Sequence, residues 1–242
     1  MPGALSVIIP AYNEEERLPP TLERLVSYLE RRGGEFEIVV VDDGSTDRTA
    51  EVALSFSRSA PVRVLRNEGN RGKGYSVRRG MLAAKGELRL FSDADLSTPI
   101  EELPKLEEAI AEGFDVAIAS RGLPQSRLLV RQPFWREMLG RTFNLYVQLL
   151  LLPGIWDTQC GFKLFTARAA EEVFRRATLD GFGFDFEALY IARKLGFRIK
   201  EVPVTWLHSP KTKVKVLRDG VVMGLEVLKV RANDLKGLYD ER

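Results

Sequence analysis

The sequence predicts an α/β fold with a doubly wound, mostly parallel sheet. Five short apolar segments rich in β-branched residues alternate with four segments of helical apolar spacing over about the first 120 residues. Strands that alternate with helices in this way form parallel sheets with a layer of helices on each face. The chain has 242 residues, and 45% of them are hydrophobic, which is enough to build one full core.

The predicted elements follow one another closely in the first half. Pro19 and Pro20 fall in the first turn of the first helix, where a missing N–H costs little, and Gly33 ends that helix. The segment from Thr98 to Glu101 reads as a capping box that opens the fourth helix. The expected strands cover residues 5–11, 36–43, 62–65, 87–91 and 114–120, and the expected helices lie at about 18–32, 45–58, 74–86 and 98–112.

The second half is less regular, and we expect it to belong to the same domain. A basic loop, 121–133, precedes a long apolar helix at about 134–152. Further elements are expected at 160–165, 166–177, 185–196 and 198–207. An amphipathic helix is expected at about 217–238, so we predict a domain over 1–215 and a C-terminal helical appendage over 216–242.

Composition excludes several classes of function. The formal net charge is +2, too small for the strong field that would indicate nucleic acid binding. Cys160 is the only cysteine, so no disulfide forms within the chain, and a reducing compartment suits it. His208 is the only histidine, so any metal must be held by carboxylates, which favours Mg²⁺ or Mn²⁺.

No segment is expected to cross a membrane, because no run of about 18 uncharged apolar residues occurs. The start of the sequence also lacks the pattern of a signal peptide. The nearest membrane candidate, 143–156, is too short and is interrupted at Pro153 and Gly154. It is either a core helix or a helix that lies at a membrane surface.

Polar residues gather where the predicted strands end. They are Asn13 and Glu14, the run from Asp42 to Ser45, Asp93 and Asp95, and Ser120 and Arg121. In sheets of this type, ligands bind beyond the carboxyl ends of the strands. Because those ends meet at one edge of the sheet, we expect a single binding site there.

Asp93 and Asp95 follow the fourth strand, one residue apart. In an extended chain, residues two positions apart point the same way, so both carboxylates can aim at one spot. Two carboxylates that close repel each other, and a divalent cation relieves the repulsion. Mg²⁺ usually takes one or two carboxylates plus ligand phosphates, so the pair predicts a metal that bridges to a diphosphate. The alternative is an acidic loop before a helix, with no metal.

The glycine-rich segment 69–76 fits no standard phosphate-binding motif. Its first glycine lies too close to Gly72 and Lys73 for a P-loop. A dinucleotide fingerprint fails as well, because Val77 stands where its third glycine belongs. The segment is either a flexible turn or a loop whose backbone N–H groups, with Arg71 or Lys73, lie near a nucleotide.

Four segments in order resemble the family 2 glycosyltransferases of the GT-A fold. They are residues 8–16, 39–47, 70–74 and 91–99. Residues 156–170 and 183–192 resemble the dolichyl-phosphate glucosyltransferases of that family and, more distantly, the dolichyl-phosphate mannose synthases. The resemblance covers almost the whole chain, and it implies a metal-dependent, inverting transferase.

The resemblance implies a nucleotide-sugar site within residues 1–120. Asp43 would accept a hydrogen bond from the ring N–H of uracil, with support from Asp42. Asp93 and Asp95 would hold the diphosphate of UDP-glucose through Mg²⁺ or Mn²⁺, Asp95 most directly. The other implied nucleotide-sugar residues are Pro10, Ala11, Tyr12, Glu14, Val41, Lys73, Ala94 and Lys213.

Catalytic roles are implied for Arg121, Asp157 and Asp185, in an acceptor half that spans 121–215. Arg121 would meet phosphate charge, and Asp157 would lie near the sugar or the acceptor. Asp185 is expected to face the site rather than Glu187, and a helix cap or a salt bridge is the alternative for each acid. At Lys213 the chain departs from the family, because Lys-Thr-Lys replaces the usual Gly-Ser-Lys.

A phosphate acceptor needs positive charge more than a base, because a phosphomonoester is mostly dianionic near neutral pH, its second pKa being about 6. Cations near the apolar helix are Arg121, Arg127, Arg131, Arg136 and Lys163. Those of the C-terminal segment are Lys211, Lys213, Lys215, Arg218, Lys229, Arg231 and Lys236. With the apolar helix they fit a lipid phosphate at a membrane surface, and solvated surface charge is the alternative.

We therefore predict an enzyme that moves glucose from UDP-glucose to a polyprenyl phosphate, bound peripherally at the cytoplasmic face of a membrane. One alternative is a soluble family 2 transferase that glycosylates a hydroxyl of a small acceptor, with Asp157 as its base. The other is a non-catalytic protein that binds nucleotide sugars. Intact Asp93 and Asp95 argue against the non-catalytic protein.

Overall fold

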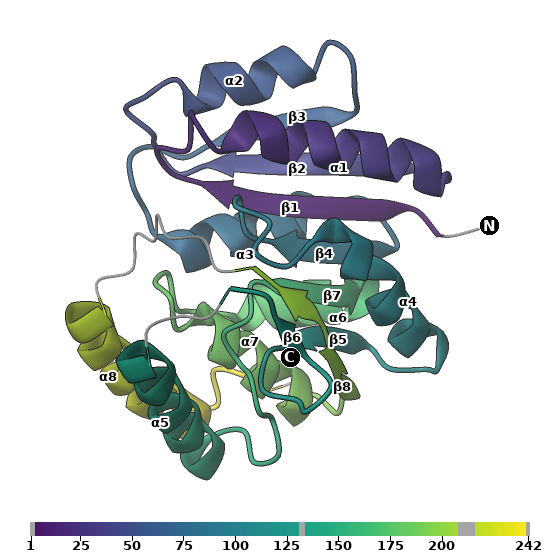
Figure 1. Ribbon diagram of the computed structural model, residues 1–242. Helices are drawn as coiled ribbons and strands as arrows, with labels where there is room; N and C mark the ends of the chain where they lie inside the picture. Colours follow the sequence, from purple (N-terminus) through teal and green to yellow (C-terminus); the bar gives the residue numbers. More distant parts are fainter. Residues whose placement is uncertain (1–2, 131–133, 208–215, 241–242) are drawn as a thin grey trace.

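The computed structural model describes residues 3–130, 134–207 and 216–240, and seven of the strands in these ranges form the central sheet (Figure 1). The strand order is β3-β2-β1-β4-β7-β5-β8. The strands are β1 (Leu5–Ala11), β2 (Phe36–Asp42), β3 (Val62–Arg66), β4 (Leu88–Ser92), β5 (Val116–Ser120), β7 (Phe162–Thr166) and β8 (Ile199–Pro203). All five strands expected in the first half are present.

The sheet is parallel except at β7. β1 pairs in parallel with β2 and β4, β2 with β3, and β5 with β8. β7 lies between β4 and β5 and is antiparallel to both. The prediction of a mostly parallel sheet is confirmed, and the inserted β7 places residues of the second half directly beside the end of β4.

Helices cover both faces of the sheet (Figure 1). One layer contains α1 (Leu18–Arg32), α2 (Thr49–Phe56) and α4 (Leu103–Ala111), and the other contains α3 (Lys73–Ala83), α6 (Ala167–Arg176) and α7 (Phe184–Lys194). Successive side chains of a strand point to opposite faces of the sheet. In β1, Ile8 packs in the hydrophobic core on one face, and Val7 and Ile9 pack in the core on the other. This is the doubly wound arrangement that the sequence predicts.

Two local predictions are wrong. Thr98 does not cap a helix: it is buried, and its hydroxyl lies 3.5 Å from the Cys160 sulfur. The helix starts instead as a short 3₁₀ turn, Ile100–Glu102, after Pro99. The strand expected over 198–207 is divided, because its last part, β9 (Thr205–Trp206), leaves the main sheet to pair with β6 (Arg127–Leu128).

The two remaining helices, α5 (Phe134–Leu150) and α8 (Val216–Leu235), lie side by side at one end of the molecule (Figure 1). The predicted C-terminal helix is thus present, and it joins the main core through Met223, Val227 and Val230. Its outer face also carries apolar side chains, which are Val221, Val222, Leu225 and Leu228. Within the described residues, no helix is both long enough and apolar enough to span a bilayer.

Candidate active site

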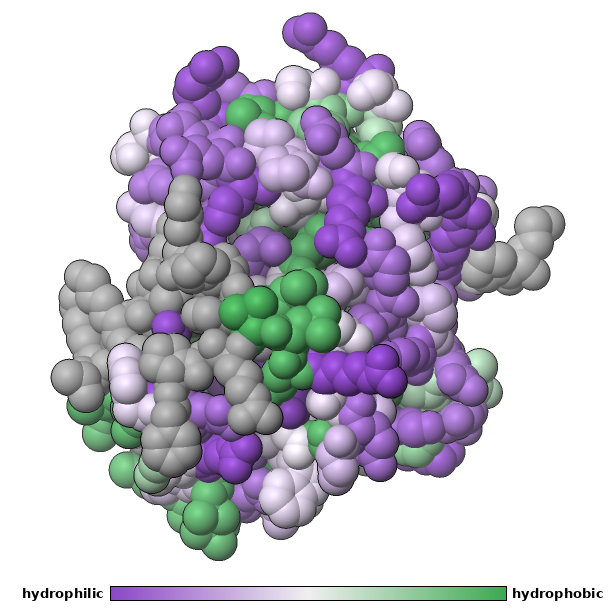
Figure 2. Space-filling model, viewed as in Figure 1, coloured by the Kyte–Doolittle hydropathy of each residue, from purple (hydrophilic) through white to green (hydrophobic). Residues whose placement is uncertain are grey.

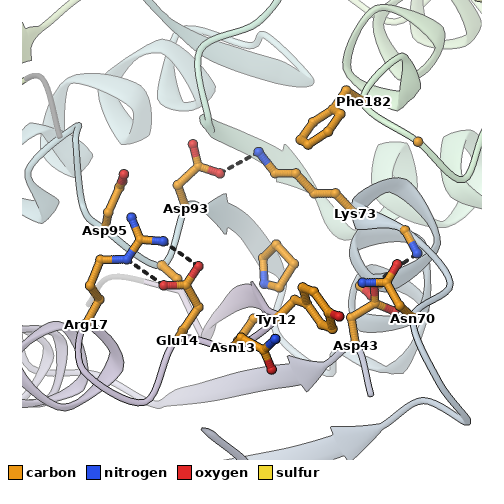
Figure 3. A pocket seen from close by; sticks show the side chains of 16 residues that line it. Tyr12, Asn13, Glu14, Arg17, Asp43, Asn70, Lys73, Asp93, Asp95 and Phe182 are labelled. Carbon is orange, nitrogen blue, oxygen red and sulfur yellow. Dashed lines mark hydrogen bonds and ion pairs between the residues drawn. The ribbon is translucent and has the colours of Figure 1, made fainter. Parts of the chain in front are cut away.

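A cavity of about 810 Å³ opens where β1, β2 and β4 end (Figure 3). Its lining comes from segments far apart in the sequence, because parallel strands bring their carboxyl ends to one edge. The lining residues are Pro10, Ala11, Tyr12, Asn13, Glu14, Arg17, Asp43, Asn70, Gly72, Lys73, Ser76, Asp93, Ala94, Asp95, Gly181 and Phe182. The polar residues at the ends of β1, β2 and β4 therefore meet around one hollow, whereas Ser120 and Arg121 at the end of β5 do not line it.

Most of the expected nucleotide-sugar residues line this cavity, but Val41 and Asp42 do not. Val41 is fully buried within the sheet core. Asp42 is buried as well: it accepts a 3.1 Å hydrogen bond from the Ser45 N–H and forms an ion pair with Arg66 at 3.2 Å. Lys213 lies outside the described residues.

Asp93 and Asp95 reach the cavity through a turn, not along an extended strand as expected. β4 ends at Ser92, and the Leu96 N–H donates to the Asp93 carbonyl at 3.2 Å. Leu96 has a φ of +45°, in the left-handed region that marks a tight turn. Asp95 also accepts a 3.0 Å hydrogen bond from the Ser97 N–H, which orients its carboxylate.

The carboxylate pair fits a hard cation that also binds a phosphate. In the described part of the chain, no cluster of three or more His, Cys, Asp or Glu side chains is arranged to hold a metal. Asp93 and Asp95 nevertheless face one cavity, and two carboxylates plus ligand phosphates are a donor set that Mg²⁺ accepts. Any metal held here would therefore depend on the nucleotide for the rest of its ligands.

Gly161, which precedes β7, makes room for the Asp93 carboxylate. The Asp93 N–H donates to the Gly161 carbonyl at 3.0 Å, so the two backbones are tied together. A Cβ atom at Gly161 would lie 1.9 Å from the Asp93 Oδ2 atom, far inside van der Waals contact. The antiparallel β7 thus creates a position beside the acidic pair that no residue with a side chain can occupy without moving it.

Asp43 organises the glycine-rich segment and does so with both oxygens. It accepts hydrogen bonds from the Asn67 side chain at 2.7 Å and from the N–H groups of Arg71 and Gly72, both at 2.9 Å. Gly72 has a φ of +103°, which a residue with a side chain rarely adopts. Asp43 lines the cavity, although it is only 4% exposed. Its expected contact with a uracil N–H stays a prediction.

The next backbone N–H groups of this segment are also hydrogen-bonded within the protein. The N–H groups of Gly74 and Tyr75 donate to the Asp180 carbonyl at 2.8 and 3.2 Å. Together with the two N–H groups bound by Asp43, they leave little backbone for a phosphate. Of the two alternatives for this segment, this argues against a loop of backbone donors beside a nucleotide. The Lys73 side chain reaches the site instead: its ammonium lies 2.7 Å from the Asp93 Oδ1 atom (Figure 3).

Lys163 and Asp185 form an ion pair in the core instead of lining the cavity. Lys163 is 1% exposed, and its ammonium also donates to the Cys160 carbonyl at 2.6 Å. The expectation that Lys163 belongs to a surface cluster of cations is therefore wrong. Cys160 is buried, and burial raises the pKa of its thiol to about 11, so it is a packed thiol and no nucleophile.

Arg121 and Asp157 form a second ion pair away from the cavity lining. Arg121 donates to the Asp157 carboxylate from its backbone N–H at 2.8 Å and from Nε and Nη2 at 2.7 and 2.9 Å. Burial alone would raise the pKa of Asp157, but the charge and hydrogen bonds of Arg121 lower it overall. A carboxylate held in this way is a poor base.

We expect Asp157→Asn to lower the free energy of unfolding by about 2 to 3 kcal/mol at pH 7. Losing one partner of a buried pair costs roughly 3–5 kcal/mol, and the 29% exposure of the Arg121 side chain reduces that penalty. Because the pKa of Asp157 is lowered in the folded state, its contribution is present above the unfolded value of about 3.9 and is lost as the pH falls through the folded one. Denaturant titrations should therefore show that the difference in free energy of unfolding between the wild type and Asp157→Asn becomes smaller below about pH 4. A difference that stays constant with pH would contradict this.

The loop 177–183 supplies one wall of the cavity through Gly181 and Phe182. Glu187, which is fully buried, anchors the loop by accepting hydrogen bonds from the N–H groups of Thr178 and Leu179. Glu187 is thus a buried acceptor of the loop. Asp185 was expected to face the site rather than Glu187, but neither residue lines the cavity.

The C-terminal segment anchors the same loop from the other side. The Glu226 carboxylate of α8 accepts a 3.1 Å hydrogen bond from the Gly183 N–H. The Tyr239 hydroxyl donates to Glu187 at 2.7 Å, and the Asn233 side chain donates to the Thr178 hydroxyl at 2.9 Å. We call these contacts of Glu226, Asn233 and Tyr239 the C-terminal clasp.

Sequence reasoning missed several lining residues. Arg17, at the start of α1, holds both oxygens of Glu14 through Nε and Nη2, each at 2.6 Å. The spacing of three residues between acid and base was the available signal. Asn70, Gly181 and Phe182 were missed as well, whereas Asn13 was expected at this edge as a polar strand end. Phe182 carried no local signal, because the long-range clasp brings its loop to the cavity.

Comparison with known proteins agrees with this geometry. The sequence matches the model of Glycosyl transferase family 2 over residues 6–174. The chain belongs to glycosyl transferase family 2. This family 2 protein is 36% identical to the dolichyl-phosphate beta-glucosyltransferase of Dictyostelium discoideum, over 97% of its own chain and 76% of the relative. It is also 36% identical to the enzyme of that name from Homo sapiens, over 97% and 77%.

Solved structures show that the family 2 chain has the fold of nucleotide-sugar transferases. Mannosyl-3-phosphoglycerate synthase from Rubrobacter xylanophilus superposes with a TM-score of 0.71 at 20% identity, over 97% of this chain and 74% of that one. Glucosyl-3-phosphoglycerate synthase from Mycobacterium tuberculosis, solved with Mn²⁺ and UDP-glucose, gives 0.67 at 20% identity, over 95% and 78%. The resemblance to GT-A transferases seen in the sequence is thereby confirmed.

Proposed function

We propose that this protein transfers glucose from UDP-glucose to a polyprenyl phosphate of the dolichyl type, with inversion at the sugar. The observation that carries the proposal is the pair Asp93 and Asp95 beside Lys73, in a cavity at the strand ends of a chain similar to dolichyl-phosphate beta-glucosyltransferases. Residues 1–120 would bind the donor, and residues 121–215 would bind the acceptor.

The chemistry requires neutralisation of a departing nucleoside diphosphate. Mg²⁺ or Mn²⁺, held by Asp93 and Asp95 when bound, would supply Lewis-acid stabilisation of the leaving charge. Tyr12 and Asp43 line the part of the cavity beside the ends of β1 and β2, where they would bind the nucleoside. Such groups lie in position before the reaction, so they stabilise developing charge without reorganising.

The two carboxylates that could act as a general base for an acceptor are both paired with cations. A hydroxyl acceptor needs a general base, whereas a phosphate acceptor is already an anionic nucleophile, its second pKa being about 6. Asp157 is held by Arg121, and Asp185 is held by Lys163. With both acids bound in ion pairs, the phosphate acceptor is the better supported of the two.

Incubation with radiolabelled nucleotide sugars and a short polyprenyl phosphate, followed by organic extraction, tests the proposal. We expect label from UDP-glucose in the organic phase only when both the lipid phosphate and Mg²⁺ or Mn²⁺ are present, and the released lipid-linked glucose should be the β anomer. Label that stays in the aqueous phase on a small alcohol would favour the hydroxyl transferase. Label in the organic phase from a different nucleotide sugar would show that UDP-glucose is not the donor.

We propose further that the protein binds a membrane, at its cytoplasmic face, through α5 and α8. Their outer side chains include Leu145, Leu149, Leu225 and Leu228, which are 55%, 75%, 63% and 52% exposed. Figure 2 shows hydrophobic surface at the lower left, over the region where Figure 1 places these two helices. Neighbouring helices with exposed leucines fit an interface between lipid head groups and acyl chains.

We expect the protein to sediment with liposomes that contain anionic lipid, and the bound fraction to fall as salt is raised. The double variant Leu149→Asp and Leu225→Asp should lower the bound fraction at least fivefold, because charges replace side chains that enter the lipid. Leu54→Asp on α2 is a matched control: Leu54 is 55% exposed, and α2 lies at the opposite end of the molecule from α5 and α8 in Figure 1. Equal binding of all three proteins would refute a docking role for these helices.

A further inference from the structure

Lys73 already binds the carboxylate that a metal would need. Its ammonium lies 2.7 Å from the Asp93 Oδ1 atom, and both residues line the cavity (Figure 3). The other oxygen of Asp93, Oδ2, lies against Gly161, where an added Cβ would be only 1.9 Å away. A cation that enters from the cavity therefore meets Lys73 at the open side of Asp93.

The ammonium of Lys73 is held in place and carries its charge. It lies 5.2 Å from the ring centroid of Phe91, 5.8 Å from that of Phe184 and 5.9 Å from that of Phe182, distances at which aromatic faces attract cations. The ion pair with Asp93 and these three rings thus fix a positive charge beside the acidic pair.

A dication and an ammonium cannot share one carboxylate without strong repulsion. Mg²⁺ binds oxygen at about 2.0–2.1 Å, so on Asp93 it would lie within a few ångströms of Lys73 in a partly desolvated cavity. A nucleoside diphosphate changes the balance, because its negative oxygens bind both cations at once. The carboxylate would then be released by the lysine and taken by the metal.

We propose that Lys73 competes with the divalent cation for Asp93, and that the donor diphosphate ends the competition by becoming the new partner of Lys73. This inference rests on the proposed function. Metal and nucleotide then bind cooperatively, and each raises the affinity of the other by the same factor. If Lys73 only bound phosphate, replacing it would not change the affinity for the metal in the absence of nucleotide.

Mn²⁺ binding to the full chain, measured with and without UDP by the electron paramagnetic resonance signal of free Mn²⁺, tests the competition. For the wild type we expect UDP to lower the Kd of Mn²⁺ at least tenfold. For Lys73→Met we expect Mn²⁺ alone to bind at least tenfold more tightly than to the wild type. The further gain from UDP should be smaller than the gain in the wild type, because it then comes only from the phosphate oxygens that bind the metal. Lys73→Gln provides a second neutral side chain, should the methionine variant not fold.

Two controls separate the competition from a general charge effect. Lys73→Arg keeps the charge and should keep the wild-type coupling. Lys105→Met removes a lysine that pairs with Glu102 outside the cavity and should behave as the wild type. If neutral variants at position 73 bind Mn²⁺ alone no better than the wild type does, the inference is overturned while the metal site stands. If the wild type binds no Mn²⁺ even with UDP, the metal-dependent donor site itself is overturned.

Discussion

Asp95→Ala is expected to lower kcat/KM for glucose transfer by at least about 10³-fold and to remove the effect of Mn²⁺ on UDP binding. Groups that stabilise charge in the transition state are typically worth 10² to 10³ in rate, and a metal ligand supports the largest such group in the site. Asp95 faces the cavity from the turn after β4, and it accepts a hydrogen bond from the N–H of the nearby Ser97 in the same turn. Its removal should therefore leave the fold almost unchanged.

The measurement combines organic-phase transfer assays with calorimetric titration of UDP in the presence of Mn²⁺. Glu101→Gln serves as the matched control, because Glu101 is an exposed acid on the same segment that pairs with Arg24 outside the cavity. The control should retain wild-type transfer, and both variants should melt within a few degrees of the wild type. Full transfer by Asp95→Ala would remove the argument that a metal on this acid assists the reaction.

Gly161→Ala is expected to lower kcat/KM by roughly 10²-fold while the protein stays folded, since misplacing catalytic groups by about 1 Å can cost that much. The added Cβ would lie 1.9 Å from the Asp93 Oδ2 atom and 2.3 Å from Cγ, so the carboxylate must turn away. The side chain of Asp93 is 33% exposed and can move into the cavity. The damage should therefore appear as weakened Mn²⁺–UDP binding and lost transfer, with little change in melting temperature.

Gly140→Ala is the control for this substitution. Gly140 lies in α5 with nothing within 4 Å of its added Cβ, so alanine there should leave transfer intact and stabilise the helix slightly. Wild-type transfer by Gly161→Ala would mean that Asp93 tolerates a large displacement, and the assigned role of the carboxylate pair would then be untenable.

Local patterns in the sequence predicted most of the sheet and the position of the cavity. Apolar runs such as Leu5–Ala11 and Phe36–Asp42 form strands that helices bury on both faces. The apolar residues of those helices recur at helical spacing, so the sequence shows them as clearly as it shows the strands. The polar residues at their ends then had to meet at one edge. This is why Glu14, Asp43 and Asp93 could be placed at the cavity without a structure, whereas Tyr12 came from the family resemblance.

The contacts that the sequence did not reveal join residues far apart in the chain. Gly161 is 68 positions after Asp93, and only the antiparallel insertion of β7 brings them together. Lys163 looked like a surface cation because nothing nearby in sequence showed that Asp185 would meet it in the core. Local periodicity reports burial, but it does not report which buried partner a charged residue finds.

The C-terminal clasp has a consequence for synthesis on the ribosome. The acidic turn with Asp93 and Asp95 emerges early, but the wall that carries Phe182 gains its last anchor only when Tyr239 has left the exit tunnel. Until Tyr239 is in place, the nascent chain carries these carboxylates beside a wall that lacks this anchor, and we expect it to bind sugar nucleotides more weakly than the folded protein does.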